Sequence, residues 1–135
     1  MKTLRFAALA VVSLFAFSAC TTTKDLEANS AASQQWIAAQ SRTKPAAVFA
    51  GNWVSTDWGG AALSQRGRKI EGVMGGYNVS GVVSGSRAYL LIQHDAKTHY
   101  TMILRRGEGN TLVGAYSDRV PFDVNVAQLA EFSAF

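Results

Sequence analysis

The sequence is poor in residue types on which many small secreted or metal-binding domains depend. It holds one cysteine, two histidines and two prolines among 135 residues. A single cysteine excludes a disulfide framework within the chain and leaves no set of thiolates for a metal site. Glycine, by contrast, occurs twelve times, which suggests tight turns and close backbone approaches within sheets.

The chain begins like a secretory signal peptide. Lys2 and Arg5 precede an unbroken stretch of apolar or small residues from Phe6 to Ala19, and Cys20 follows directly. A short basic segment, a core of about a dozen apolar residues and a small-residue boundary are the parts of such a signal. The stretch is too short to cross a hydrocarbon core of about 30 Å as a helix.

Phe17-Ser18-Ala19-Cys20 resembles the lipobox of bacterial lipoproteins, although leucine is usual where Phe17 stands. The resemblance implies that the Cys20 thiol is diacylated, that residues 1–19 are removed, and that the new amino terminus gains a third acyl chain. Two or more acyl chains anchor a protein stably to a membrane. In that family an aspartate after the cysteine retains the protein at the inner membrane. Thr21 implies the outer membrane if the source is Gram-negative, and an ordinary secretory signal with a chance cysteine is the alternative.

The charge argues against nucleic acid as a partner. The formal charge of +4 falls to +2 once Lys2 and Arg5 leave with the signal, and the remaining 116 residues are enough for one small domain. The densest basic cluster, Arg66-Gly67-Arg68-Lys69, falls in an expected turn. A solvated hairpin is the simpler interpretation there, and contact with acidic lipid headgroups is the alternative.

Residues 20–47 are expected to form a lipidated tether that is partly helical or disordered. Its apolar residues Leu26, Trp36 and Ile37 are too sparse for a continuous helical stripe. Asp25 can cap a short helix, and the Pro45 segment ends it. We expect Trp36-Ile37 to pack on the following domain; a position among lipid headgroups, where tryptophan is favoured, is the alternative.

From residue 48 onward, short alternating runs are separated by glycine and small polar residues. This pattern predicts a β domain over residues 48–135, and connections of two to five residues leave room only for antiparallel neighbours. The expected strands cover residues 49–57, 61–65, 69–74, 77–83, 87–94, 98–106 and 111–117, with an eighth over 121–126.

Glycine stands in the middle of three expected strands, at Gly72, Gly81 and Gly114. Mid-strand glycine weakens a flat sheet but permits the sharp coiling that a small barrel needs. Closing the sheet into a barrel also removes its exposed edges. The sequence therefore predicts an all-β fold. It is a small antiparallel up-and-down meander of seven or eight strands that forms a closed or nearly closed barrel.

Gly51-Asn52-Trp53, followed by a tight turn, resembles the G-x-W opening of lipocalins and avidins, the calycin barrels. Lys69-Ile70-Glu71-Gly72, which leads into a hairpin, is also similar to avidins. The resemblance implies a barrel architecture and no particular binding residue. In that superfamily a basic residue near the closing strand often packs over the tryptophan. The sequence offers no clear counterpart, since Arg119 lies in an expected turn.

Few residues are candidates for catalysis or metal binding. His94 and His99 flank a turn, but a metal site needs three or four convergent ligands, so a solvated polar hairpin is the expectation. Ser117, Asp118 and His99 do not make a triad, because adjacent residues of a strand point to opposite faces. We expect a protein that is not an enzyme and holds neither cofactor nor metal.

The remaining question is whether the barrel holds a ligand, because small barrels are either filled by side chains or take one small molecule. Alternation places Tyr100, Met102 and Leu104 on one apolar face, which favours a filled core. The expected function is that of a non-enzymatic, membrane-anchored envelope lipoprotein whose barrel meets an envelope protein or serves a structural role. The alternative is a lipocalin-like carrier of a small apolar or amphipathic ligand. The residues expected to line such a site or to build the core are Trp53, Tyr77, Tyr89, Tyr100 and Tyr116.

Overall fold

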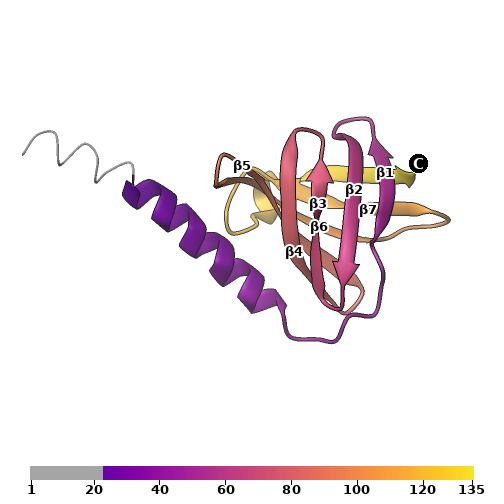
Figure 1. Ribbon diagram of the computed structural model, residues 1–135, viewed down its shortest axis with the longest axis horizontal. Helices are drawn as coiled ribbons and strands as arrows, with labels where there is room; N and C mark the ends of the chain where they lie inside the picture. Colours follow the sequence, from indigo (N-terminus) through magenta and orange to yellow (C-terminus); the bar gives the residue numbers. More distant parts are fainter. Residues whose placement is uncertain (1–22) are drawn as a thin grey trace, which may run out of the picture.

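A closed barrel of eight antiparallel strands forms most of the molecule (Figure 1). The computed structural model describes residues 23–135, so the predicted signal peptide and Cys20 lie outside the described residues. Each strand pairs with its neighbours in sequence, and β8 closes the sheet on β1. The predicted up-and-down meander and its closure are thereby confirmed. The strands are β1 (Gly51–Ser55), β2 (Gly59–Arg66), β3 (Lys69–Met74), β4 (Tyr77–Ser84), β5 (Arg87–His94), β6 (Lys97–Arg106), β7 (Thr111–Ser117) and β8 (Gln128–Ala134).

The two ends of the barrel differ. The β1–β2, β3–β4 and β5–β6 turns and the β7–β8 connection lie at one end, which we call the mouth. At the other end, which we call the closed end, residues 43–49 pass across the barrel before β1 begins. Phe49 is fully buried there, and its N–H donates to Gln65 Oε1 (2.8 Å). Gln65 Nε2 donates in turn to the Ala47 carbonyl (3.1 Å), so this segment seals the interior.

The prediction of an eighth strand over residues 121–126 is wrong. Pro121 has no N–H to give to a strand ladder, and residues 124–126 form a short 3-10 helix instead. Asp123 caps that helix by accepting a hydrogen bond from the Asn125 N–H (2.9 Å). The strand that closes the barrel is β8, in which Ala130 and Phe132 alternate into the core.

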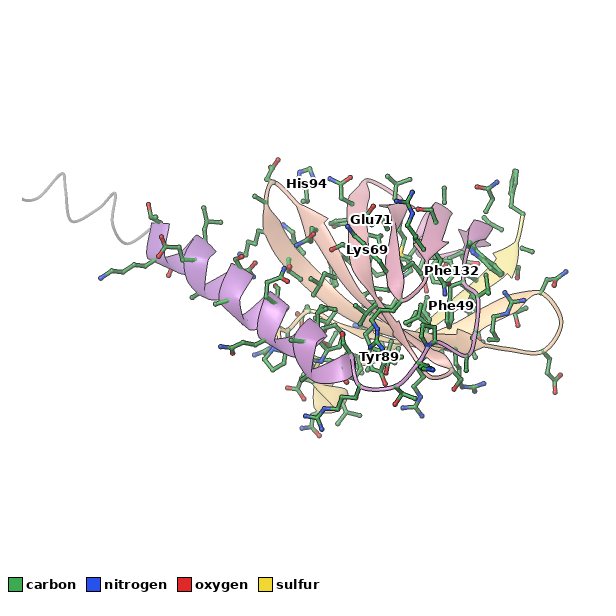
Figure 2. The ribbon with its side chains drawn as sticks, turned by 60° about the horizontal axis from the view of Figure 1, so that its bottom comes forward. Phe49, Lys69, Glu71, Tyr89, His94 and Phe132 are labelled. Atoms are coloured by element: carbon green, nitrogen blue, oxygen red, sulfur yellow. The ribbon has the colours of Figure 1, made fainter. Side chains whose placement is uncertain are left out.

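The segment before the barrel is a helix over residues 23–40 that packs along the outside of the barrel (Figures 1 and 2). Its Trp36 is only 8 % exposed and meets Tyr89 of β5 edge to face, with ring centroids 6.0 Å apart. The expectation that Trp36 packs on the domain is confirmed. Over most of its length the tether is therefore a docked helix rather than a loose linker.

Polar contacts from the middle of this helix fix it to β6. Asn29 pairs with both backbone groups of Thr98: its Nδ2 donates to the carbonyl (3.1 Å) and its Oδ1 accepts from the N–H (2.9 Å). Ser33 Oγ donates to Thr98 Oγ1 (2.8 Å). The β5–β6 register shifts between Ile92 and Gln93, and such a shift leaves part of a ladder unpaired. Asn29 supplies the hydrogen-bond partners that the backbone of Thr98 lacks in the ladder.

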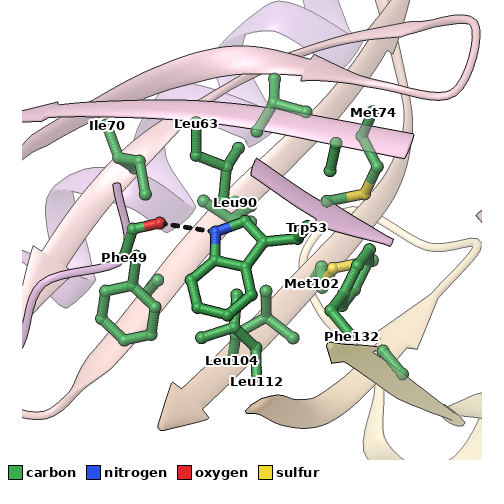
Figure 3. Close-up of a cluster of buried hydrophobic side chains, with 14 of the residues drawn as sticks. Phe49, Trp53, Leu63, Ile70, Met74, Leu90, Met102, Leu104, Leu112 and Phe132 are labelled. Atoms are coloured by element: carbon green, nitrogen blue, oxygen red, sulfur yellow. Dashed lines mark hydrogen bonds between the residues drawn. The ribbon is translucent and has the colours of Figure 1, made fainter. Parts of the chain in front are cut away.

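The inner face of the barrel is filled by apolar side chains (Figure 3). Trp53 of β1 lies among them and is 4 % exposed. Inward positions recur at every second residue of each strand, as the pleat of a sheet requires. The buried cluster comprises Phe49, Trp53, Ala61, Leu63, Ile70, Met74, Val79, Val83, Ala88, Leu90, Ile92, Met102, Leu104, Leu112, Ala130 and Phe132.

Neighbouring strands approach most closely at the three mid-strand glycines. A Cβ placed on Gly72, Gly81 or Gly114 would overlap a carbonyl oxygen of the adjacent strand; for Gly81 that oxygen belongs to Tyr89. Backbone atoms cannot move aside as the tip of a flexible side chain can. The close approach agrees with the coiling that the sequence predicts.

We predict that Gly81→Ala lowers the melting temperature of the protein. The added methyl group forces a backbone shift of the overpacking kind, which typically costs about 1–3 kcal/mol. For a domain of this size, each kcal/mol corresponds to about 4–8 °C. Gly60→Ala is the matched control, because a Cβ on Gly60 of β2 meets nothing within 4 Å. Equal melting temperatures for the two variants would contradict this account of closure.

We also predict that Trp36→Ala loosens the helix while the barrel stays folded. An isolated helix of this length is marginal in water, so its order depends on packing. Hydrogen exchange of the amides in residues 23–40 is expected to become at least about tenfold faster, with the strand amides still protected. Gln35→Ala, at an exposed position of the same helix turn, serves as the control. Unchanged exchange in Trp36→Ala would mean that the polar contacts alone hold the helix.

Candidate functional site

Four aromatic side chains gather at the mouth of the barrel, and we call them the mouth cluster. Trp58 lies in the β1–β2 turn, whereas Tyr77, Tyr100 and Tyr116 come from the mouth ends of β4, β6 and β7. Trp58 packs edge to face against the three tyrosines, with ring centroids 5.9, 5.3 and 5.0 Å away, in that order. All four side chains are half-buried and rest on the core. The cluster therefore covers the core at the mouth.

A shallow pocket of about 230 Å³ lies in the mouth cluster, bordered also by Asp57 and the β3–β4 turn. The Trp58 Nε1 atom is buried and has no hydrogen-bond acceptor among the described residues. Tyr116 Oη is engaged, since it donates to Gln128 Oε1 (2.9 Å). The pocket thus offers aromatic surface and one carboxylate, whereas the indole N–H of Trp58 is buried beneath that surface. This lining suits a small amphipathic group and supplies no nucleophile with an adjacent base.

Burial raises the pKa of the Tyr100 hydroxyl above its ordinary value of 10.0. Repulsion from Tyr77 and a hydrogen bond with that side chain raise the pKa further. A phenolate at this position would lose its hydration inside an aromatic cluster. Tyr100 is therefore a neutral group in the mouth at physiological pH.

Trp53 lies away from the mouth cluster, and a basic residue does pack over it. The Trp53 Nε1–H donates to the Phe49 carbonyl (3.0 Å). The guanidinium carbon of Arg106, the last residue of β6, lies 5.2 Å from the Trp53 ring centroid, and Arg106 Nη1 donates to the Val48 carbonyl (3.2 Å). The expectation that no such partner exists is wrong. Closure of the barrel, which the linear sequence does not display, brings the end of β6 over this ring.

Tyr89 does not belong to the barrel interior. It follows the inward-facing Ala88 on β5 and lies on the outer face, near the helix (Figure 2). There its ring meets that of Trp36. The suggestion that Tyr89 lines a ligand site inside the barrel or builds its core is therefore wrong. Trp53 lies in the core, and the other three tyrosines lie in the mouth cluster.

The histidine hairpin does not converge with further ligands. The His94 and His99 ring centroids are 6.2 Å apart, and His94 contacts the adjacent Asp95 (3.3 Å). Within residues 23–135 no group of three or more histidine, cysteine or acidic side chains is placed to hold a metal ion. Ser117 Oγ is occupied by Thr101 Oγ1 (3.0 Å) and the Asp123 N–H (3.2 Å).

Comparison with known proteins gives no family for this chain: no protein-family model, no curated protein and no solved structure matches it. Among the helices of the described part, none is long and apolar enough to cross a membrane. The interior of the barrel is apolar and is covered at both ends, by the mouth cluster and by residues 43–49.

We predict that Tyr100→Phe removes the most alkaline phenolate transition in an ultraviolet pH titration of the folded protein. A raised pKa means that the folded chain holds this proton more tightly than the unfolded chain. The free energy of unfolding therefore falls as the pH rises from the ordinary pKa of tyrosine to that of folded Tyr100. Tyr100→Phe should flatten this fall, whereas Tyr89→Phe on the outer wall should keep it. If the free energy of unfolding still falls with pH in Tyr100→Phe, another group is responsible for the fall.

Proposed function

We propose that the protein is a non-enzymatic lipoprotein of the bacterial cell envelope, and that its barrel works through its outer surface. The observation that carries the proposal is the filled interior, where sixteen buried apolar side chains occupy the inner face. A ligand inside the barrel would have to displace these side chains. Cores are packed to nearly crystalline density, so that displacement is costly. The outer surface thus becomes the place where a partner in the envelope is met.

The proposed anchor is Cys20, with the outer membrane as the destination suggested by Thr21. Three residues lead from Cys20 to Thr23, and they cannot span more than about 11 Å. The first half of the helix is held near the mouth by Asn29, and a helix over residues 23–40 is about 27 Å long. On this proposal the helix acts as a fixed spacer, with the mouth towards the membrane and the closed end away from it.

A relation to the calycin barrels is part of the same proposal. The G-x-W opening at Gly51 supplies Trp53, and Arg106 packs over that ring. The pairing of a buried tryptophan with a basic residue supports the relation, as does the up-and-down topology. This kinship concerns architecture and assigns no ligand to the barrel.

We predict that Cys20→Ala abolishes both lipidation and membrane association. Metabolic labelling with a palmitate analogue should mark the wild-type protein and leave Cys20→Ala unlabelled and in the soluble fraction. Thr21→Asp is the matched control: it should keep the label and, in a Gram-negative host, move the protein to the inner membrane. Labelling that survives Cys20→Ala would overturn the proposed anchor.

A further inference from the structure

A groove runs over the outer wall of the barrel, away from the mouth cluster. Its floor is the outer face of β6 and β7, including Ile103, Val113 and Ala115. Its wall is the β7–β8 connection, which contributes Phe122 and Val124. The space is about 230 Å³ and is lined mainly by carbon atoms. We call it the outer groove.

Two arginines border the outer groove at its closed-end side. Arg87 of β5 and Arg105 of β6 stand directly opposite each other in the strand register, and both side chains are exposed. Like charges placed opposite each other across a strand pair destabilise a sheet. Neither arginine forms an ion pair within the described residues. The nearest acidic position in this row is Glu131 of β8, separated from Arg105 by Val113 of β7.

Other basic residues add to the positive charge of Arg87 and Arg105 at the closed end. Acidic positions gather at the mouth and at the start of the helix, whereas the closed end holds three acids, Glu71, Glu108 and Glu131, of which Glu71 is paired with Lys69 (3.0 Å). Clustered charge of one sign raises the local concentration of counter-ions. The basic residues at the closed end are Arg42, Lys44, Arg66, Arg68, Lys69, Arg87, Arg105 and Arg106.

Apolar surface continues from the groove to its neighbours. Val124 is 76 % exposed, and Leu129 of β8, which pairs with Ala115 in the register, is 64 % exposed. Contiguous apolar patches on soluble domains mark binding sites more often than single exposed residues do. A free inorganic anion would leave this surface bare. A ligand that joins an anionic head to an apolar tail would cover it.

We propose that the outer groove binds an amphipathic anion. Its carboxylate or phosphate head lies between Arg87 and Arg105, and its tail lies over Ile103 and Val113 against Phe122. Arginine is suited to both heads because its planar fork donates paired hydrogen bonds to either. The proposal needs no anchor at Cys20 and so stands apart from the proposed function. We assign the head to a free single-chain amphiphile, because the space of about 230 Å³ suits one short tail, and a lipid in a bilayer is the other outcome that the experiment tests.

The test uses the chain from residue 20 with Cys20→Ala, which retains every described residue and has no site for acylation. Decyl phosphate, kept below its micelle concentration, is titrated by calorimetry and by backbone amide NMR. Saturable binding is expected, with the largest shifts at Val113, Phe122 and Val124. Decyltrimethylammonium, with the same tail and the opposite charge, and inorganic phosphate, with no tail, should bind much more weakly.

Arginine variants locate the head. Removing a charge-assisted hydrogen bond should weaken decyl phosphate binding roughly tenfold in Arg87→Gln and in Arg105→Gln. Both variants should melt slightly higher than the parent without ligand, because each relieves the opposed like charges. Arg66→Gln is the matched control, an arginine of the same end on the β2–β3 side. Its affinity should change by less than about twofold, since exposed charges at a distance are screened.

Three results would overturn the proposal. Equal binding of the cationic and anionic amphiphiles would show that the arginines do not bind the head. Equal losses of decyl phosphate affinity in Arg66→Gln and Arg105→Gln would show that only the general positive charge of the closed end attracts it. Inorganic phosphate that binds as tightly as decyl phosphate would remove the role of the groove. Vesicles with and without phosphatidylglycerol identify the source. Binding of the anionic vesicles that is lost in Arg105→Gln supports a bilayer headgroup as the occupant, and binding of decyl phosphate alone supports a free amphiphile.

Discussion

At Gly72, Gly81 and Gly114 the backbones of neighbouring strands approach so closely that a methyl group would not fit, and this approach sets how tightly the sheet curls. A sheet that curls this far brings β8 beside β1 and removes both of its edges. The enclosed space is then small enough for the inward side chains to fill it. Every later property follows from that closure, because a filled barrel can meet other molecules only at its ends and on its wall.

The strand order and the closure could be predicted from the sequence because turn residues separate alternating runs and glycine marks the sharp bends. The position of Tyr89 could not, because the run from Ala88 to Ile92 is apolar at every residue. Both faces of β5 are covered there, one by the core and one by the helix, so alternation disappears. The last strand was misplaced because Pro121 and Asp123 favour a turn, a signal that outweighs the β-branched residues around them.

The sequence predicted a partly helical tether but not a helix docked along its length, for a different reason. The docking face of the helix uses Asn29, Ser33 and Trp36, and the first two of these residues make hydrogen bonds rather than apolar contacts. Hydrophobic periodicity cannot detect such a face. Arg106 over Trp53 and the opposed Arg87 and Arg105 were equally hidden, because each depends on strand register that a linear chain does not display.

The route of the chain also decides how the molecule carries mechanical load. The helix runs from the mouth to the closed end, and the chain then turns back into β1 at the closed end. Tension applied at the amino terminus therefore reaches the contacts of Asn29 and Trp36 before it reaches any strand. The contacts of the helix with the barrel therefore resist a pull at the amino terminus before the strands themselves are loaded.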